Sequence, residues 1–307
     1  MVTRGTGRSA EAQAFFEEFS GSLLTTPRAE NLAQYRIDAR QDFEPYVRRA
    51  LSRHQVDIED IEIDGIPCKQ VTAPEWSAEN GICIQYAFGG GAVGGSPYED
   101  LIITIPLARY TRSRILMVDY RLAPEDPYPA AQQDMVRVYA SLLDHYGADR
   151  LVVSGESAGG NLALALLQHI RDQKMAMPCC AALLSPWCDL TGQGDSHLFN
   201  DNRDPTLNNE WVDIAAALYA NGTPLDDPAI SPLFAEMHDL PVTIITTGSC
   251  DLLLSECLRL ARKMRAAGVT CDLRVWEGMW HVFEFYNDLP ESEQSILEIA
   301  EFIRVHT

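Results

Sequence analysis

A serine flanked by glycines occupies the point where a buried strand should meet a helix. The pattern G-x-S-x-G spans residues 155–159, after the β-branched run 151–153 and before strong helix formers at 161–167. A strand, a sharp turn and a helix would hold the Ser157 hydroxyl at the end of a sheet, where it can be activated as a nucleophile. Such a turn strains the serine backbone and tolerates only small neighbours, which accounts for the glycines on both sides. The arrangement predicts nucleophilic catalysis by Ser157.

A nucleophilic serine needs a histidine to take its proton, and one histidine is well placed to do so. In a sheet of this kind the residues occur along the chain in the order serine, acid, histidine. His281 lies in a loop beyond the last expected strand, from which it can reach the serine. His238 precedes the best acid candidate, and His306 lies in an expected terminal helix. We therefore predict that His281 is the general base.

The acid that holds this histidine should also follow a strand of the sheet. Asp251 comes after the expected strand 242–247 and a short turn, so its carboxylate would emerge at the same edge as Ser157. Asp189 follows the preceding strand and is the alternative, because some serine hydrolases carry their acid there. Of the two we favour Asp251.

A glycine-rich loop directly after the expected strand 82–87 can supply backbone donors. The segment 88–91 ends in three glycines, which leave the backbone free to turn its N–H groups toward a developing negative oxygen. We expect the N–H groups of Gly89, Gly90 and Ala158 to form an oxyanion hole. A phosphate-binding loop is the other interpretation, but the lysine and the serine or threonine of that motif are missing here.

Strands alternate with helices along most of the chain, which is typical of a mostly parallel sheet covered by helices on both faces. We expect strands at 58–63, 68–72, 82–87, 115–118, 151–154, 181–184, 242–247 and 271–275, and helices near 98–110, 130–146, 158–172, 252–267 and 291–304. The alternation stops between 190 and 232, where glycines and prolines surround a single helical pattern at 210–220. We therefore predict four segments: an N-terminal helical cap segment (1–53), the first part of an α/β core (54–190), a cap insertion (191–231) and the second part of the core (232–307).

The composition excludes several classes of partner. The 307 residues carry 24 basic and 44 acidic side chains, a formal charge of -20 that repels nucleic acid and anionic membranes. No apolar run approaches the ~18 residues of a membrane-spanning helix. The N-terminus lacks the pattern of a signal peptide, so we expect a cytoplasmic protein. The eight cysteines show no metal-ligand spacing, so we expect reduced thiols. We expect no cofactor.

Taken together, these motifs and their order resemble those of the hormone-sensitive-lipase-like family of α/β-hydrolases, the bacterial family IV esterases. The resemblance covers most of the chain beyond about residue 80 and rests on the glycine loop and on the segments 118–125 (VDYRLAPE), 155–160 (GESAGG), 185–187 (SPW) and 278–281 (GMWH). It implies an α/β-hydrolase fold with a helical cap, and hydrolysis of carboxylic esters through an acyl-enzyme without a metal. It assigns a catalytic triad to Ser157, Asp251 and His281, an oxyanion hole to Gly89, Gly90 and Ala158, and support of the acid loop to Glu256.

Three residues depart from the family pattern. Phe88 stands where the family loop begins with histidine, Glu156 replaces the usual aspartate before the nucleophile, and Leu252 replaces the proline after the triad acid. A phenylalanine at position 88 cannot make the hydrogen bonds by which the family histidine would fix the loop. It could instead present an aromatic wall to a bulky or aromatic substrate.

We therefore expect a serine carboxylesterase that acts on short- to medium-chain or small aromatic esters. Its partner would be a small-molecule ester, contacted by the aromatic residues Phe88, Trp187, Trp211 and Trp280. A hydrolase of lactones, amides or a specialised metabolite, or a lyase, would keep the same motifs. A ligand-binding relative without turnover would be expected to lack a member of the triad. Relatives often pair through the edge strand, here near 271–275, which makes a homodimer one further expectation.

Overall fold

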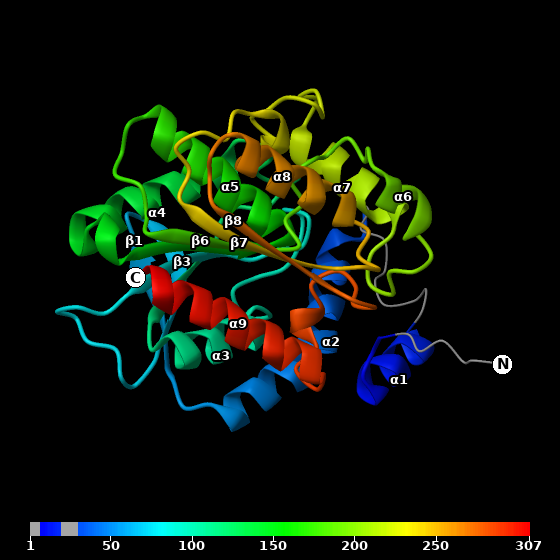
Figure 1. Cartoon of the computed structure of the whole chain (residues 1–307), viewed down its shortest axis with the longest axis horizontal. Coiled ribbons are helices and arrows are strands. Elements are labelled where there is room, and N and C mark those ends of the chain that lie inside the picture. The colour runs from blue at the N-terminus through cyan, green and yellow to red at the C-terminus, as the bar shows by residue number, and fades with distance from the viewer. Residues whose placement is uncertain (1–6, 20–29) are drawn as a thin grey trace.

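The computed structural model describes residues 7–19 and 30–307 of the chain (Figure 1). Within these residues, eight strands form one sheet: β1 (Asp57–Ile63), β2 (Ile66–Thr72), β3 (Cys83–Ala87), β4 (Arg114–Val118), β5 (Leu151–Glu156), β6 (Cys180–Leu184), β7 (Val242–Gly248) and β8 (Cys271–Trp276). Their order across the sheet is β1-β2-β4-β3-β5-β6-β7-β8. β2 pairs antiparallel with β1 and β4, and all other neighbours pair parallel. The mostly parallel sheet predicted from the sequence is confirmed.

The central strands are continuous apolar runs because both of their faces are covered. Every residue of β3, β5 and β6 is buried. β1 has the sequence DIEDIEI, alternates between exposed and half-buried positions, and forms one edge of the sheet. β8 forms the other edge.

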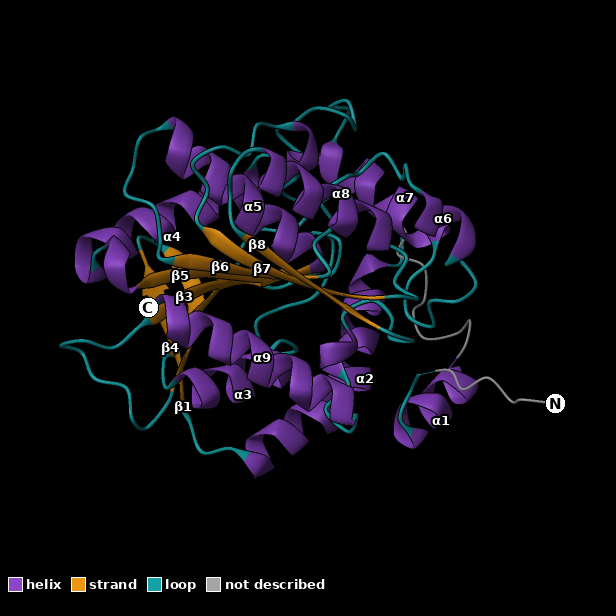
Figure 2. Cartoon of the chain, in the orientation of Figure 1, coloured by secondary structure: helices purple, strands orange, loops and turns teal. Residues whose placement is uncertain are grey.

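Helices cover both faces of this sheet and one of its ends. Their bounds are α1 (Ala10–Phe19), α2 (Leu32–Arg53), α3 (Leu101–Thr111), α4 (Ala130–Tyr146), α5 (Ser157–Asp172), α6 (Asp195–Phe199), α7 (Asn209–Ala220), α8 (Leu254–Ala266) and α9 (Pro290–His306). Figure 2 shows α4, α5 and α8 on one face, with α3 and α9 on the other. The predicted arrangement of helices on both faces is therefore confirmed.

Two segments that are far apart in the sequence lie together beyond one end of the sheet (Figure 1). Leu32 and Tyr35 of α2 belong to one buried apolar cluster with Trp211 and Val212 of α7. At the same end, Phe15 of α1 belongs to a second cluster with residues of the loop after β8. These helices form a helical cap, whereas the boundaries of the four predicted segments remain a prediction.

Candidate active site

Ser157 is the first residue of α5 and follows the last residue of β5. Its φ of 51° lies in the left-handed region, which costs energy for a residue with a side chain. The glycines beside it are needed because a Cβ at Gly159 would collide with the carbonyl oxygen of Ala87, and one at Gly155 with the backbone of Gly159. The strained turn predicted from the sequence therefore exists, and it holds the hydroxyl at the carboxyl end of an inner strand.

The structure brings together the three side chains predicted to form the triad. Nε2 of His281 lies 2.9 Å from Oγ of Ser157, and Nδ1 of the same ring lies 3.1 Å from Oδ1 of Asp251. The Asp251 carboxylate also accepts hydrogen bonds from the Thr247 hydroxyl at 2.9 Å and from the Leu253 N–H at 2.8 Å. These two bonds orient the carboxylate toward the imidazole. Serine, histidine and acid thus form one continuous chain of hydrogen bonds.

The electrostatics of the site favour a protonated imidazole. Burial alone would lower the pKa of His281, but the adjacent Asp251 carboxylate and its hydrogen bond raise that pKa above the ordinary value of 6.5. Burial also opposes ionisation of Asp251, yet the charge of His281 and its hydrogen bond lower the pKa of that carboxyl group. An imidazolium that forms when Ser157 loses its proton would therefore be stabilised.

The alternative acid and the other histidines lie in different surroundings. The buried Asp189 carboxylate accepts hydrogen bonds from the backbone N–H and the hydroxyl of Thr191, and pairs with Arg259 at 2.6 Å. His238 pairs with the residue beside it, and His306 bonds within the helix α9 that carries it. The geometry therefore favours the predicted acid and base over these alternatives.

The glycine loop after β3, residues 88–91, borders the same pocket as Ser157; we call it the oxyanion loop. Gly89 and Gly90 line this pocket together with Ser157. Gly90 has a φ of 86°, which a residue with a side chain adopts only under strain. The predicted oxyanion donors at 89 and 90 therefore lie next to the predicted nucleophile, and Ala158 follows the nucleophile directly.

Phe88 lies behind the oxyanion loop rather than in the wall of the pocket. Its side chain is fully buried and stacks on the ring of Tyr120, with the ring centroids 4.1 Å apart. The Tyr120 hydroxyl donates a hydrogen bond to the Phe88 carbonyl at 2.7 Å. Contrary to our expectation of an aromatic wall, Phe88 supports the loop by packing.

Among the tryptophans expected at the substrate, Trp211 lines the pocket, but Trp187 and Trp280 do not. Trp187 is buried in the apolar cluster that joins α2 and α7. Trp280 is fully buried and stacks on Phe15, with the ring centroids 4.7 Å apart. The aromatic walls come instead from residues that sequence reasoning missed: Tyr35, Phe43, Phe285 and Tyr286. The aromatic residues just after the histidine were an available signal for the last two.

Buried carboxyl groups give one part of the pocket an acidic lining. Glu99, Asp100 and Glu156 all contribute to it. Burial raises the pKa of each of these groups. The charge of Glu99 raises the pKa of Asp100 further, and the charge of Asp100 raises that of Glu156. The pocket encloses about 720 Å³ of free space, including its open mouth. The raised pKa values favour the neutral, protonated form of these carboxyl groups.

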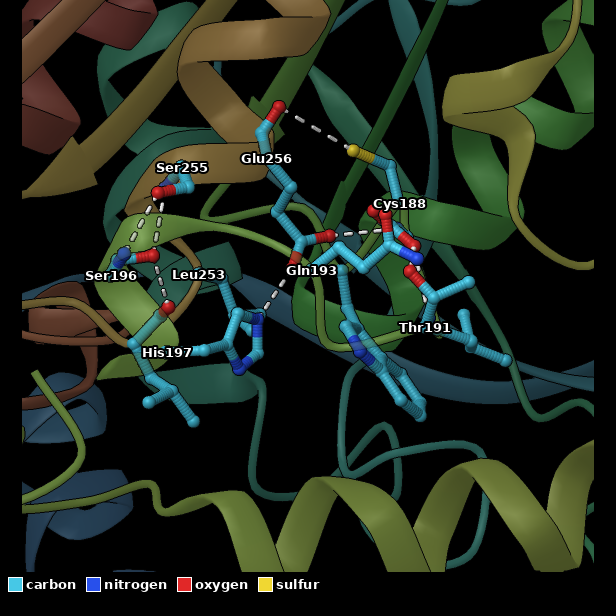
Figure 3. A network of polar contacts seen from close by, with 12 residues as sticks. Cys188, Thr191, Gln193, Ser196, His197, Leu253, Ser255 and Glu256 are labelled. Carbon is cyan, nitrogen blue, oxygen red and sulfur yellow. Dashed lines mark hydrogen bonds and ion pairs between the residues drawn. The ribbon is translucent and has the colours of Figure 1, made fainter. Parts of the chain in front are cut away.

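Glu256, the residue implied to support the acid loop, connects α8 to the cap insertion (Figure 3). Its Oε2 accepts a hydrogen bond from the Asp189 N–H at 2.8 Å, and its Oε1 lies 3.7 Å from Nε2 of His197 in α6. Burial raises the pKa of Glu256 to about 7, although His197 lowers it. Burial opposes protonation of His197, but the nearby Glu256 carboxylate and the hydrogen bond to Asn209 raise its pKa overall. Glu256 thus acts through the cap insertion and the loop after β6.

Two kinds of feature are absent from the part of the chain that the structure describes. Across residues 7–19 and 30–307, no group of histidine, cysteine, aspartate and glutamate side chains is arranged to hold a metal ion. No helix in these ranges is both long and apolar enough to span a bilayer. All eight cysteines are free thiols.

Comparison with known proteins agrees with this architecture. Residues 84–285 match a family model described as alpha/beta hydrolase fold. An esterase of Acinetobacter venetianus is 32% identical over 291 residues, covering 94% of this chain and 94% of that protein. The crystal structure of EstE5 soaked with p-nitrophenyl butyrate has a TM-score of 0.87 at 32% identity, covering 97% of this chain and 99% of that chain. An esterase from the bacterial hormone-sensitive lipase family has a TM-score of 0.84 at 32% identity, covering 100% and 99% of the two chains. The chain therefore belongs to the alpha/beta hydrolase fold family and, within it, to the hormone-sensitive-lipase-like branch.

Proposed function

We propose that the protein is a serine carboxylesterase in which Ser157 is the nucleophile, His281 the general base and Asp251 the acid that orients it. The observation that carries this proposal is the chain of hydrogen bonds from Ser157 Oγ to His281 Nε2 at 2.9 Å and from His281 Nδ1 to Asp251 Oδ1 at 3.1 Å. Both distances suit proton transfer and orientation of the ring. Membership of a family whose similar members are named esterases supports the same reaction.

In the first half of the reaction Ser157 attacks the ester carbonyl. His281 Nε2 accepts the hydroxyl proton, and the Asp251 carboxylate stabilises the resulting imidazolium. The carbonyl oxygen becomes an oxyanion that the N–H groups of Gly89, Gly90 and Ala158 would hold. When the tetrahedral intermediate collapses, His281 returns the proton to the leaving alcohol and the acyl group stays on the serine.

In the second half, water repeats the same steps. His281 takes a proton from the water, whose oxygen attacks the acyl carbonyl, and the same backbone donors hold the oxyanion. Collapse releases the carboxylic acid and returns the proton from His281 to Ser157. Every step uses side chains and backbone groups of this chain.

We propose short- to medium-chain or small aromatic esters as substrates. The pocket is bordered by aromatic rings such as Tyr35, Trp211 and Phe285. These rings favour apolar acyl or alcohol groups of moderate size. The butyrate ester present with the related EstE5 is a compound of the same class.

Pre-steady-state hydrolysis of p-nitrophenyl butyrate tests the proposal. We expect a burst of p-nitrophenol equal to the concentration of active sites, followed by slower turnover, because the acyl-enzyme accumulates. Ser157→Ala should abolish the burst and lower turnover by at least about 10³-fold. Ser154→Ala, which removes a buried hydroxyl bonded to Ala182 from the same strand, should keep both phases. Full activity in Ser157→Ala would refute the proposed nucleophile.

We also propose a cytoplasmic location and a homodimer. Eight free cysteine thiols support a reducing compartment. The support for a dimer is that β8 is an edge strand, whose Val275 is 44% exposed and whose outer backbone groups can pair with a second copy.

A further inference from the structure

A buried carboxylate of the cap insertion contacts both loops that carry the base and the acid. Asp204 lies between α6 and α7 and is 4% exposed. Its Oδ2 accepts hydrogen bonds from the backbone N–H of His281 at 3.1 Å and of Leu252 at 3.0 Å. Leu252 directly follows Asp251. Oδ2 of Asp204 is therefore hydrogen-bonded both to the backbone of His281 and to the backbone of the residue that follows Asp251.

The second oxygen of Asp204 holds this arrangement in place. Oδ1 accepts hydrogen bonds from the Thr206 N–H at 2.9 Å, the Thr206 hydroxyl at 2.8 Å and the Leu207 N–H at 3.1 Å. The local turn thus directs Oδ2 toward the two loops. Because all five groups donate, an ionised carboxylate can satisfy them, whereas an asparagine would have to place its own NH₂ against donors on one side.

The two loops leave different strands, so their relative position is not fixed by the sheet alone. The acid loop follows β7 and the histidine loop follows β8. Three hydrogen bonds join the loops before the triad residues: the Ser249 N–H donates to the Trp276 carbonyl at 2.9 Å, the Cys250 N–H to the Met279 carbonyl at 2.8 Å, and the Gly278 N–H to the Ser249 hydroxyl at 2.8 Å. Asp204 joins them at His281 and immediately after Asp251. It is therefore the contact best placed to set the distance between base and acid.

Besides its hydrogen bonds, Asp204 has a charge that favours the protonated form of His281. Burial raises the pKa of Asp204 to about 6, and the Asp251 charge adds to this rise while His281 lowers it. The carboxylate is therefore mostly ionised at neutral pH. Asp251, Asp204 and Glu256 are the carboxylates that raise the pKa of His281. Asp204 thus places a second negative charge close to the imidazolium of the reaction.

We propose that Asp204 is a positioning residue for ester hydrolysis: it keeps the His281 ring in line with Asp251 and Ser157, and it makes this alignment depend on the docked cap insertion. The inference rests on the proposed function, because it presupposes that these three residues form the triad. Asp204 does not act on the substrate. It acts through the backbone of the two residues that do.

Asp204→Asn, measured with p-nitrophenyl butyrate over a range of pH, tests this role. We expect kcat to fall by about 10²-fold, because a displacement of the base by about 1 Å can cost that much. KM should change by less than about threefold, since the variant loses alignment rather than ground-state binding. The midpoint of the acid limb of kcat/KM should move to lower pH, because one of the three carboxylates that stabilise the protonated imidazole is gone. The fall in kcat at nearly constant KM tests the positioning of the base, and the shift of the midpoint tests the charge.

Two further variants separate position, charge and folding. Asp204→Glu keeps the charge but displaces it by one methylene, so kcat should stay low while the pH midpoint remains close to that of the wild type. Asp189→Asn removes a carboxylate that is equally buried at the junction of cap and core and that pairs with Arg259, so it should leave kcat and the pH profile unchanged. Circular dichroism of all three variants reports whether each one folds.

The proposal would be overturned by a folded Asp204→Asn variant with kcat within twofold of the wild type, whatever its pH midpoint. Loss of folding in both Asp204 variants, with a folded Asp189→Asn variant, would also contradict it, because the proposed role requires a folded enzyme with a misaligned triad. Failure of the proposed function has a different signature. In that case the wild type itself would give no burst, or Ser157→Ala would keep it.

Discussion

At the scale of single residues, the proposed mechanism depends on the His281 imidazole, whose pKa is set by its neighbours. His281 is buried, which alone would favour the neutral ring, but Asp251 lies 3.1 Å away and reverses that preference. The same carboxylate that stabilises the imidazolium in the reaction therefore raises the pH at which the resting base becomes protonated. The pH profile of the enzyme should record this balance.

We expect kcat/KM for p-nitrophenyl butyrate to fall toward acid pH with a midpoint above 6.5, the ordinary pKa of histidine. The sign follows from the mechanism: His281 must be neutral to accept the serine proton, so activity is lost as the pH falls through its raised pKa. His238→Gln, a change at an exposed histidine that pairs with Asp239, should leave the midpoint unchanged. A midpoint below 6.5 would contradict the proposed electrostatics.

The meeting of Ser157, Asp251 and His281 could be predicted from the sequence because these residues follow strands in a fixed order. The role of Phe88 could not. A loop residue next to a glycine run can point into the pocket or behind it, and only the packing against Tyr120 decides between these positions. Asp204 was also missed, since its partners are backbone N–H groups of loops that lie 48 and 77 residues further along the chain.

At the scale of elements, the short helix α6 attaches the cap insertion to the start of α8. The Ser196 N–H donates to the Ser255 hydroxyl at 2.9 Å, and the Ser255 N–H donates to the Ser196 hydroxyl at 3.0 Å (Figure 3). The Ser196 hydroxyl also donates to the Leu252 carbonyl at 2.6 Å. This reciprocal pair joins the cap insertion to the same loop that Asp204 contacts.

A double-mutant cycle on this pair should reveal coupling. We expect Ser196→Ala and Ser255→Ala each to lower the free energy of unfolding by about 1–2 kcal/mol, because each leaves a backbone N–H without its partner. The double variant should lose at least about 0.5 kcal/mol less than the sum. Urea unfolding gives all four values, and strict additivity would show that the two bonds are independent.

The sequence did not reveal α6 because its pattern is not amphipathic. The helix has five residues, and its apolar side chains Leu198 and Phe199 are 79% and 69% exposed. Longer helices were predicted to within a few residues, since their apolar stripes match the faces that they bury. A helix held by two serine hydroxyls leaves no such stripe.

At the scale of the whole molecule, acidic groups are concentrated both on the surface and in the interior. The formal charge is -20. Several buried carboxyl groups have raised pKa values because of burial: Asp100, Glu156, Asp204, Glu256 and Glu284. Each of these carboxyl groups keeps its proton to a higher pH in the folded state than in the unfolded chain. The folded state therefore binds more protons over this range.

We expect the protein to be more stable at pH 5 than at pH 7.5. Where the folded state binds more protons, the free energy of unfolding falls as the pH rises. The window opens at the ordinary pKa values, 3.8 for Asp204 and 4.5 for Glu256, and extends to about 6 and about 7 for these two groups. Urea unfolding at the two pH values measures the difference. Glu256→Gln should reduce it by on the order of 2 kcal/mol, because its amide does not ionise. Greater stability at pH 7.5 would contradict this reasoning.

The architecture could be inferred from the alternation of strands and helices, because a parallel sheet needs a covering helix between strands. The assembly of the cap could not. Its two parts, near Tyr35 and near Trp211, are far apart in the sequence and meet only because both pack over the same end of the sheet, with ring centroids 6.4 Å apart.

The most direct test of the central claim is to locate the nucleophile by covalent labelling with a fluorophosphonate. Peptide mass spectrometry of the labelled wild type should find a single adduct on Ser157, and Ser157→Ala should take up no label under the same conditions. A stoichiometric adduct on another residue, or undiminished labelling of the alanine variant, would contradict the account.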